Sequence, residues 1–437
     1  MNPPFTKKNL RDLAPYLLWV LPLSFLAVFY FYPLGSIFQL SFSRGEGSAL
    51  LGFWNALRSS TVRDVLGFTL WQAVLSTALT LLLGLPGAYL FARYTFKGKK
   101  FLRSLFGVPF VMPTLVVAAG FNALLGPNGL VNNLLANIFQ LSSPPIQFMN
   151  SFMAILVAHV FYNTTIVLRV VGDYWSRLDP RFAQAARVLG ANRWQILRQI
   201  TVPLLAPAVA AASLLVFIFD FTSFGVILVL GGPQFATLEV EIYYQTISLF
   251  NLPMAATLSL LQLGITLLLT VLYTRLMNRI SGPVRQRAEA QTQQLLYTRK
   301  QKLLAGGFIL LLLVFLTSPL IALAARSVTS LGPANGSPGL TWAFFKALAR
   351  NPQESLFYVP PTTAIGISFG YAMITVILSL LLGLPAAWAL ARSKGSRLNR
   401  ILDPVLMLPL GTSAVTLGLG FIVALDHPPL DLRASPL

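Results

Sequence analysis

The chain has 437 residues, of which 55% are hydrophobic and only 10% are charged. A soluble domain carries roughly 25% charged residues, so this composition excludes a soluble core as the main architecture. The formal net charge of +19 would suit a nucleic-acid partner, but the placement of the basic residues argues against one.

Nine apolar stretches, each long enough to cross a hydrocarbon layer, recur along the chain. A layer about 30 Å thick needs roughly 20 apolar residues in a helix. Because lipid offers no partners for backbone polar groups, we expect these stretches to be helices. The sequence therefore predicts an all-α integral membrane protein. In chain order the predicted spans are 14–40, 66–91, 104–125, 151–171, 203–230, 254–276, 303–325, 366–391 and 404–425.

The Lys and Arg residues are concentrated at the N-terminus and in alternate loops between the predicted spans. The loop after the second span carries several of them, whereas the loop 126–150 has no charged residue. Basic residues favour the cytoplasmic side of a membrane. We therefore expect a multi-pass protein of the bacterial cytoplasmic (inner) membrane, with a cytoplasmic N-terminus, in contact with membrane lipid and without a nucleic-acid partner.

Residues that carry chemistry are scarce. The sequence has no cysteine and only two histidines, His159 and His427, so it offers no thiolate metal site and redox chemistry is disfavoured. It contains no G-x-x-x-x-G-K-[ST] phosphate loop, and no nucleophile, base and orienting group stand out as a catalytic set. We expect no catalytic residue, no metal and no cofactor, and therefore no enzyme activity in this chain.

An internal repeat divides the chain. The segment Leu82–Arg93 recurs as Leu381–Arg392, and both copies precede a basic loop. This predicts two parallel repeats: a first repeat of six helices in 1–276, a cytoplasmic linker in 277–302, and a second repeat in 303–437. The second repeat reaches only its third helix, so we expect it to be truncated.

The polar stretch between the fourth and fifth spans has strong signals for helix ends. Asp179 is a good N-cap, Pro180 suits the first helical position, and Gly190 suits the residue just past a helix end. Asn192 followed by Gln195 has the spacing of a capping box. These signals predict a short helix outside the membrane, a turn, and a second helix that leads into the fifth span.

The same stretch carries a motif that begins with Gln184-Ala185-Ala186, continues with Gly190 and ends with Ile200-Thr201-Val202-Pro203. Its spacing resembles the EAA loop of ABC importer permeases, here at about 179–203, although Gln184 stands where glutamate is usual and Val202 where leucine is usual. The resemblance implies a loop that docks on an ATPase and transmits its movement. The residues it implicates are Ala183, Gln184, Ala185, Ala186, Gly190 and Pro203. A surface-bound amphipathic helix is the alternative interpretation.

A wider resemblance points to a subgroup. The segments 230–243 and 158–163 are similar to the fused two-half permeases of the thiamine importer family, and ferric-iron permeases share that design. This implies a multi-helix ABC importer permease fold and a small solute, thiamine or ferric iron. It also implies two copies of an ABC ATPase subunit, which bind the ATP, and a periplasmic or extracytoplasmic solute-binding protein.

Four polar residues are candidates for contact with solute or partner. Asp220 is the only acidic residue well inside a predicted span, where an ionisable group is costly. It could line the path of a cationic solute such as thiamine, or bond to Thr222, Ser223 or another helix. His159 is a second pathway candidate, although a packing role is the more common one. Glu239 and Glu241 lie on the predicted outer side, where they could meet a binding protein or simply be solvated.

Two other functions compete with the importer permease. A secondary carrier of the major facilitator type also has two parallel six-helix halves. The motif spacing and the lack of paired acids and bases inside the spans argue against it. An integral membrane enzyme is the weakest alternative. Because one coupling loop would engage only one of two ATPase sites, we expect the chain to be inactive by itself.

Overall fold

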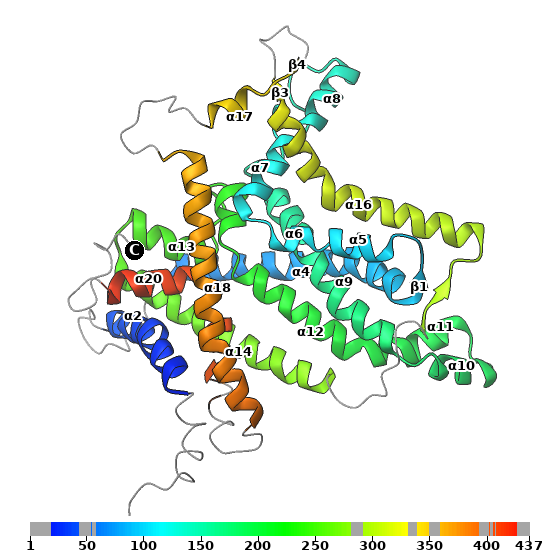
Figure 1. Cartoon of the computed structure of the whole chain (residues 1–437), viewed down its shortest axis with the longest axis horizontal. Coiled ribbons are helices and arrows are strands. Elements are labelled where there is room, and N and C mark those ends of the chain that lie inside the picture. The colour runs from blue at the N-terminus through cyan, green and yellow to red at the C-terminus, as the bar shows by residue number, and fades with distance from the viewer. Residues whose placement is uncertain are drawn as a thin grey trace, which may run out of the picture. The chain divides into compact units, whose positions relative to one another are not determined.

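The computed structural model describes residues 19–42, 54, 58–280, 292–330, 339–348, 359–392, 402, 405–406 and 408–425. Within these ranges eight helices are long and apolar enough to cross a membrane. The predicted all-α integral membrane class is therefore confirmed. The chain forms two compact units, one of Phe53–Ala325 and one of Met1–Gly52 with Arg326–Leu437, and we describe each by itself (Figure 1).

The larger unit is built around four long helices: α4 (Ser60–Arg93), α9 (Phe152–Arg177), α12 (Val202–Phe221) and α14 (Leu252–Ile280). Helix α12 packs against the other three, and α4 packs along α9 (Figure 1). Small residues bring α4 and α9 close together, as expected for helices in lipid. A Cβ added at Gly84 of α4 would lie only 2.7 Å from the Cβ of Val167 on α9.

Shorter elements complete this unit. Strands β1 (Tyr94–Thr95) and β2 (Gln294–Leu295) pair in parallel, and the long helix α16 (Arg299–Val328) follows β2. The remaining elements are α5 (Lys99–Leu105), α6 (Val108–Val111), α7 (Thr114–Leu125), α8 (Leu130–Phe139), α10 (Arg181–Val188), α11 (Arg193–Ile196), η2 (Leu197–Thr201), η3 (Ile227–Gly231), α13 (Leu238–Tyr243) and η4 (Tyr244–Ser248).

The smaller unit contains two contacting helices, α2 (Tyr32–Phe42) and α20 (Ala414–Ala424). The hydroxyls of Tyr30 and Thr412 lie 2.6 Å apart and join the same two segments. Its other elements are η1 (Ala27–Phe31), the antiparallel pair β3 (Thr329–Ser330) and β4 (Gly339–Leu340), α17 (Ala343–Ala347), α18 (Pro361–Arg392) and η5 (Leu408–Gly411).

The third predicted span, 104–125, is wrong as a single helix. The chain forms three helices across this stretch, and α7 begins only at Thr114. Pro113 explains the break before α7, because proline lacks the backbone N–H that continues a helix and keeps the preceding residue extended. Met112, which precedes Pro113, has an extended backbone with ψ of 137°. The apolar helical stretch in this region is instead Thr114–Phe139.

The fifth and ninth predicted spans also need correction. The predicted helix 203–230 ends at Phe221, and the chain becomes helical again only near Ile227. Of the ninth, 404–425, the structure describes a helix over Ala414–Ala424, which is shorter than the other apolar helices. The division into 1–276, 277–302 and 303–437 stays a prediction. Residues 1–18, 281–291 and 426–437 lie outside the described residues.

Candidate functional site

A helical elbow follows α9, as the sequence predicts. Helix α10 begins directly after Pro180, and its first backbone N–H, that of Arg181, donates a 3.0 Å hydrogen bond to Oδ1 of Asp179. The helix ends before Gly190, whose φ of +84° lies in the left-handed region that glycine adopts without steric cost. We call the segment 179–203, which contains α10, this turn, α11 and η2, the elbow.

The second arm of the elbow is anchored by a capping box. The backbone N–H of Gln195 donates to Oδ1 of Asn192, and the backbone N–H of Asn192 donates to Oε1 of Gln195, both at 2.8 Å. From there the helix is continuous through the π-helical turn η2 into α12, and Pro203 lies just after this wider turn. The second arm of the elbow is therefore one continuous helix with α12.

The outer surface of the elbow is apolar and exposed. Phe182, Val188 and Leu189 are 54%, 89% and 87% exposed. Ala185 is exposed as well, whereas Ala183 and Ala186 are partly buried. Exposed apolar groups that gather on one helix typically mark an interaction site.

The inner side of the elbow faces a cavity of about 910 Å³, which we call the elbow cavity. Its wall is formed by α10, by the end of α4, by α9 and by the first half of α12. Ala183 and Gln184 line this cavity, so the structure divides the motif residues between the inner and the outer side of α10.

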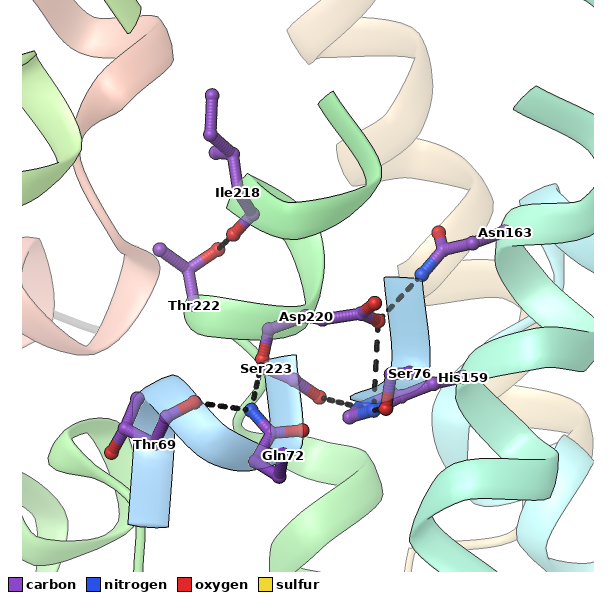
Figure 2. Close-up of polar contacts among 9 residues, drawn as sticks. All are labelled: Thr69, Gln72, Ser76, His159, Asn163, Ile218, Asp220, Thr222 and Ser223. Atoms are coloured by element: carbon purple, nitrogen blue, oxygen red, sulfur yellow. Dashed lines mark hydrogen bonds and ion pairs between the residues drawn. The ribbon is translucent and has the colours of Figure 1, made fainter. Parts of the chain in front are cut away.

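A second group of polar residues lies deep between α4, α9 and α12. The side-chain amide of Asn163 donates a 2.7 Å hydrogen bond to Oδ1 of Asp220, and Nδ1 of His159 lies 3.5 Å from the same oxygen (Figure 2). All three side chains are buried, and Asp220 has no exposed surface. Because polar groups in an apolar interior are costly unless they are bonded, this arrangement holds the carboxyl group in place.

The surrounding side chains extend this group, which we call the polar cluster. Both ring nitrogens of His159 have a hydroxyl neighbour: Ser76 Oγ lies 3.0 Å from Nδ1 and Ser223 Oγ lies 2.8 Å from Nε2. The side-chain amide of Gln72 donates to the backbone oxygens of Asp220, at 2.7 Å, and of Thr69 (Figure 2). The cluster thus joins α4 and α9 to the point where α12 ends.

The structure brings the two predicted pathway residues, Asp220 and His159, into one cluster. It also shows that Asp220 bonds to another helix, while Thr222 bonds to the backbone oxygen of Ile218 within its own helix. No solute can reach Asp220 in this conformation because its side chain is fully buried. A role for either residue in the solute path stays a prediction. Within the described residues, no group of three or more His, Asp or Glu side chains is placed to hold a metal ion.

In this conformation Glu239 is neither solvated nor accessible to a partner protein, contrary to both alternatives that the sequence left open. Glu239 is fully buried on α13, where it accepts a hydrogen bond from the side-chain amide of Gln262 on α14. The reason is that α13 packs one face against α14 and turns Glu239 inward. Glu241 is half-buried, and its carboxyl accepts a 2.7 Å hydrogen bond from Gln245.

Sequence reasoning missed several residues that hold this architecture. Asn132 is 1% exposed, and its side chain bonds to the backbone of both Gly126 and Ile146. Gln72 and Asn163, which position Asp220, were also missed. The available signal was an uncharged amide within or beside an apolar stretch, because such a group must find a partner when it is buried.

The fold and the site together define a multi-pass, all-α membrane protein. Eight of the described helices are long and apolar enough to cross a membrane. Helices α4, α9 and α12 share the buried polar cluster, and the exposed elbow lies between α9 and α12.

Part of the chain matches the model of a known family. The model of the family described as "Binding-protein-dependent transport system inner membrane component" matches residues 81–282, which include the elbow and the polar cluster. The matched part of the chain is similar to the permease subunits of ABC importers. The family match supports this function over a carrier of the major facilitator type.

Three relatives illustrate the similarity. The thiamine transport system permease protein ThiP of Brucella abortus (strain 2308) is 28% identical over 402 residues, which cover 90% of this chain and 68% of that protein. ThiP of Haemophilus influenzae is 33% identical over 258 residues, covering 59% and 46%. The putative 2-aminoethylphosphonate transport system permease protein PhnU of Salmonella choleraesuis is 27% identical over 268 residues, covering 61% and 94%. The predicted resemblance to thiamine permeases is confirmed.

A solved structure supports the fold alone. A chain of a bacterial alginate ABC transporter, crystallised in complex with an alginate pentasaccharide-bound periplasmic protein, matches with a TM-score of 0.52 and 19% identity. The match covers 63% of this chain and 97% of that chain.

Proposed function

We propose that this permease moves thiamine across the bacterial inner membrane, driven by an ATPase that docks on the elbow. The observation that carries the proposal is the elbow itself: a short helix whose outer face exposes Phe182, Val188 and Leu189 and whose arms are fixed by a turn at Gly190. A rigid helix joined to a buried helix suits the transmission of a push from a partner protein.

The route of that push follows from the backbone. Helix α11 continues through η2 into α12, and the last turn of α12 holds Asp220 in the polar cluster. ATP-driven closure of two ATPase subunits would displace α10, and the continuous helix would carry this movement to the point where α12 ends. The side on which the elbow lies is then cytoplasmic, in agreement with its basic residues, and the N-terminus is cytoplasmic as well.

A solute-binding protein is the second partner that we propose, on the opposite side of the membrane. The name of the matching family refers to binding-protein-dependent transport, and the alginate transporter was crystallised with its periplasmic protein. The uncharged segment 140–150, which follows α8, is one surface available for this contact, because Asn132 of α8 holds the backbone of Ile146.

Thiamine is the solute that the relatives favour, since the similarity to thiamine permeases extends over 90% of the chain. A second candidate is 2-aminoethylphosphonate, because PhnU is 27% identical over 94% of its own length. Ferric iron, the other solute that the sequence resemblance implies, stays a prediction.

Deletion of the encoding gene in the source bacterium, in a background that cannot synthesise thiamine, tests the solute. We expect the uptake of radiolabelled thiamine to be lost and that of 2-aminoethylphosphonate and ferric iron to be unchanged. Uptake in the parent strain should stop when ATP is depleted and persist when a protonophore collapses the ion gradient. Loss of 2-aminoethylphosphonate uptake with normal thiamine uptake would reassign the solute.

Co-purification tests the docking of the ATPase. The variant Leu189→Asp places a charge on the exposed apolar face of the elbow and should reduce the amount of ATPase that co-purifies with the chain by at least tenfold. Phe139→Asp, on the exposed face of α8 outside the elbow, is the matched control and should retain the ATPase. Equal retention by both variants would exclude the elbow as the docking site.

A further inference from the structure

The elbow cavity lies at the level where three membrane helices reach the same end of the bundle. Its wall includes Arg93, the last residue of α4, and Trp175, two residues before the end of α9. It also includes Arg193, the first residue of the apolar helical stretch Arg193–Phe221. The cavity therefore spans the boundary between the hydrocarbon layer and water.

Three guanidinium groups line this cavity, those of Arg93, Arg187 and Arg193, and no Asp or Glu lines it. They come from three different elements, α4, α10 and α11. None of the three makes an ion pair with another described residue. Three unpaired cations that face one space favour an anionic occupant, and guanidinium groups in particular suit phosphate oxygens.

The remainder of the wall is mostly apolar. Leu85, Val202, Leu205 and Val209 line it from α4 and α12. An inorganic anion would leave this surface without a partner. An occupant with an anionic head and a hydrocarbon tail would contact both parts of the wall.

Aromatic residues mark the depth of the cavity in the membrane. Tyr89, Tyr94 and Trp175 line it, and the ring centroids of Tyr89 and Trp175 are 5.2 Å apart. Tyrosine and tryptophan are enriched where hydrocarbon meets the headgroups. The indole N–H of Trp175 is covered from water and has no hydrogen-bond partner among the described residues.

We propose that the elbow cavity binds an anionic phospholipid. The lipid phosphate would lie against Arg93, Arg187 and Arg193, and the start of an acyl chain would lie along the apolar wall of α12. A volume of about 910 Å³ accommodates a headgroup with part of its chains. Basic pockets between membrane helices on the cytoplasmic side are a known form of anionic lipid site. The inference does not depend on which solute the permease carries.

The bound lipid would have a structural consequence for the elbow. It would occupy the space lined by both α10 and α12 and would thus support the inner face of the helix on which a partner pushes.

Native mass spectrometry of the full chain, titrated with phosphatidylglycerol or with phosphatidylcholine, tests the proposal. The wild-type chain should retain phosphatidylglycerol at least fivefold more strongly than phosphatidylcholine. Each arginine near an anionic lipid contributes about a fivefold change in binding. The triple variant Arg93→Gln, Arg187→Gln, Arg193→Gln should therefore lose more than tenfold of the phosphatidylglycerol retention.

Two further variants separate the site from general charge. Arg181→Gln with Arg198→Gln removes two exposed arginines of the elbow that do not line the cavity, and it should retain the lipid. Ala206→Phe places a large ring on the cavity wall while it keeps all three arginines, and it should weaken retention of the lipid even if the triple variant does not fold. Equal retention of the two lipids by the wild-type chain, or unchanged retention by Ala206→Phe, would overturn the proposal. So would displacement of the lipid by millimolar glycerol phosphate, because a soluble anion would then suffice.

Discussion

The side-chain amide of Asn163 donates a 2.7 Å hydrogen bond to the carboxyl of Asp220, which ties the middle of α9 to the last turn of α12. Asp220 has no exposed surface and Asn163 is 4% exposed. This bond holds the end of the helix that begins at the elbow. Its loss should therefore affect both stability and the position at which α12 ends.

The variant Asn163→Leu tests this relationship. It keeps the volume of the side chain and leaves a buried carboxyl oxygen without its donor, which costs about 1–3 kcal/mol. We expect a lower melting temperature of the chain in detergent. Ser213→Ala on α12 is the control, because it removes only a bond to Val209 within the same helix and should cost less than about 0.5 kcal/mol. Equal losses in both variants would contradict a special role for the bond.

The sequence alone predicted the parts of the fold that obey local rules. The caps at Asp179, Gly190 and Asn192 predicted the elbow because each satisfies backbone groups within a few residues. The long apolar helices followed from length and hydropathy. Asp220 was recognised because a carboxyl inside a span is unusual, whereas its partners lie 57 and more residues away along the chain and no local pattern indicates them.

The errors have a common physical origin. The spans 104–125 and 203–230 were drawn as single helices because hydropathy does not register a break in a helix that stays in an apolar environment. The break before α7 could have been predicted from Pro113. The end of α12 at Phe221 could not, because it depends on the contacts of the polar cluster. Glu239 was placed at the surface because it is charged, but its environment depends on how α13 packs against α14.

The repeat supplies a matched pair of glycines, Gly84 and Gly383. A Cβ at Gly84 would lie 2.7 Å from the Cβ of Val167, whereas a Cβ at Gly383 meets no described atom within 4 Å. Overpacking costs about 1–3 kcal/mol, so Gly84→Ala should destabilise the chain by this amount. Gly383→Ala should be neutral or slightly stabilising, because alanine favours helices over glycine. Thermal unfolding of both variants in detergent gives the comparison, and similar effects would show that Gly84 is not a contact point.

The turn of the elbow can be tested by a second pair of glycines, Gly190 and Gly98. Both have φ near +80°, and neither has an atom within 4 Å of an added Cβ, so alanine introduces the same backbone strain of about 1–2 kcal/mol at each. We expect Gly190→Ala to reduce the transport-dependent ATPase rate of the assembled importer several-fold, because the turn would shift α10. Gly98→Ala should leave the rate near that of the wild type. If the two variants reduce the rate equally, strain in the loops rather than the elbow is responsible.

Gln184 lines the elbow cavity together with Arg187 and Arg193. The variant Gln184→Glu introduces a carboxylate beside these cations and competes with an anionic occupant. We expect retention of phosphatidylglycerol to fall about fivefold in native mass spectrometry. Gln140→Glu adds the same charge after α8, away from the cavity, and should leave retention unchanged. A reduction in both variants would point to net charge instead of the site.

Neighbouring asparagines on α8 offer the last test. Asn132 is buried and its side chain makes hydrogen bonds of 2.9 Å with the backbone of Gly126 and with both backbone groups of Ile146. Asn133 makes one bond, to Asn128. Because Asn132→Ala leaves several buried backbone groups without partners, it should cost about 2–3 kcal/mol and speed hydrogen exchange at the Ile146 amide.

Asn133→Ala should change neither quantity beyond about 0.5 kcal/mol, since its single bond lies at the surface. Hydrogen–deuterium exchange resolved over residues 126–150 separates the two outcomes. Faster exchange confined to Ile146 and its neighbours would show that the side chain of Asn132 holds the segment 140–150 against α8. Unchanged exchange in Asn132→Ala would mean that this segment is held by its apolar contacts, and the surface proposed for the binding protein would then not depend on Asn132.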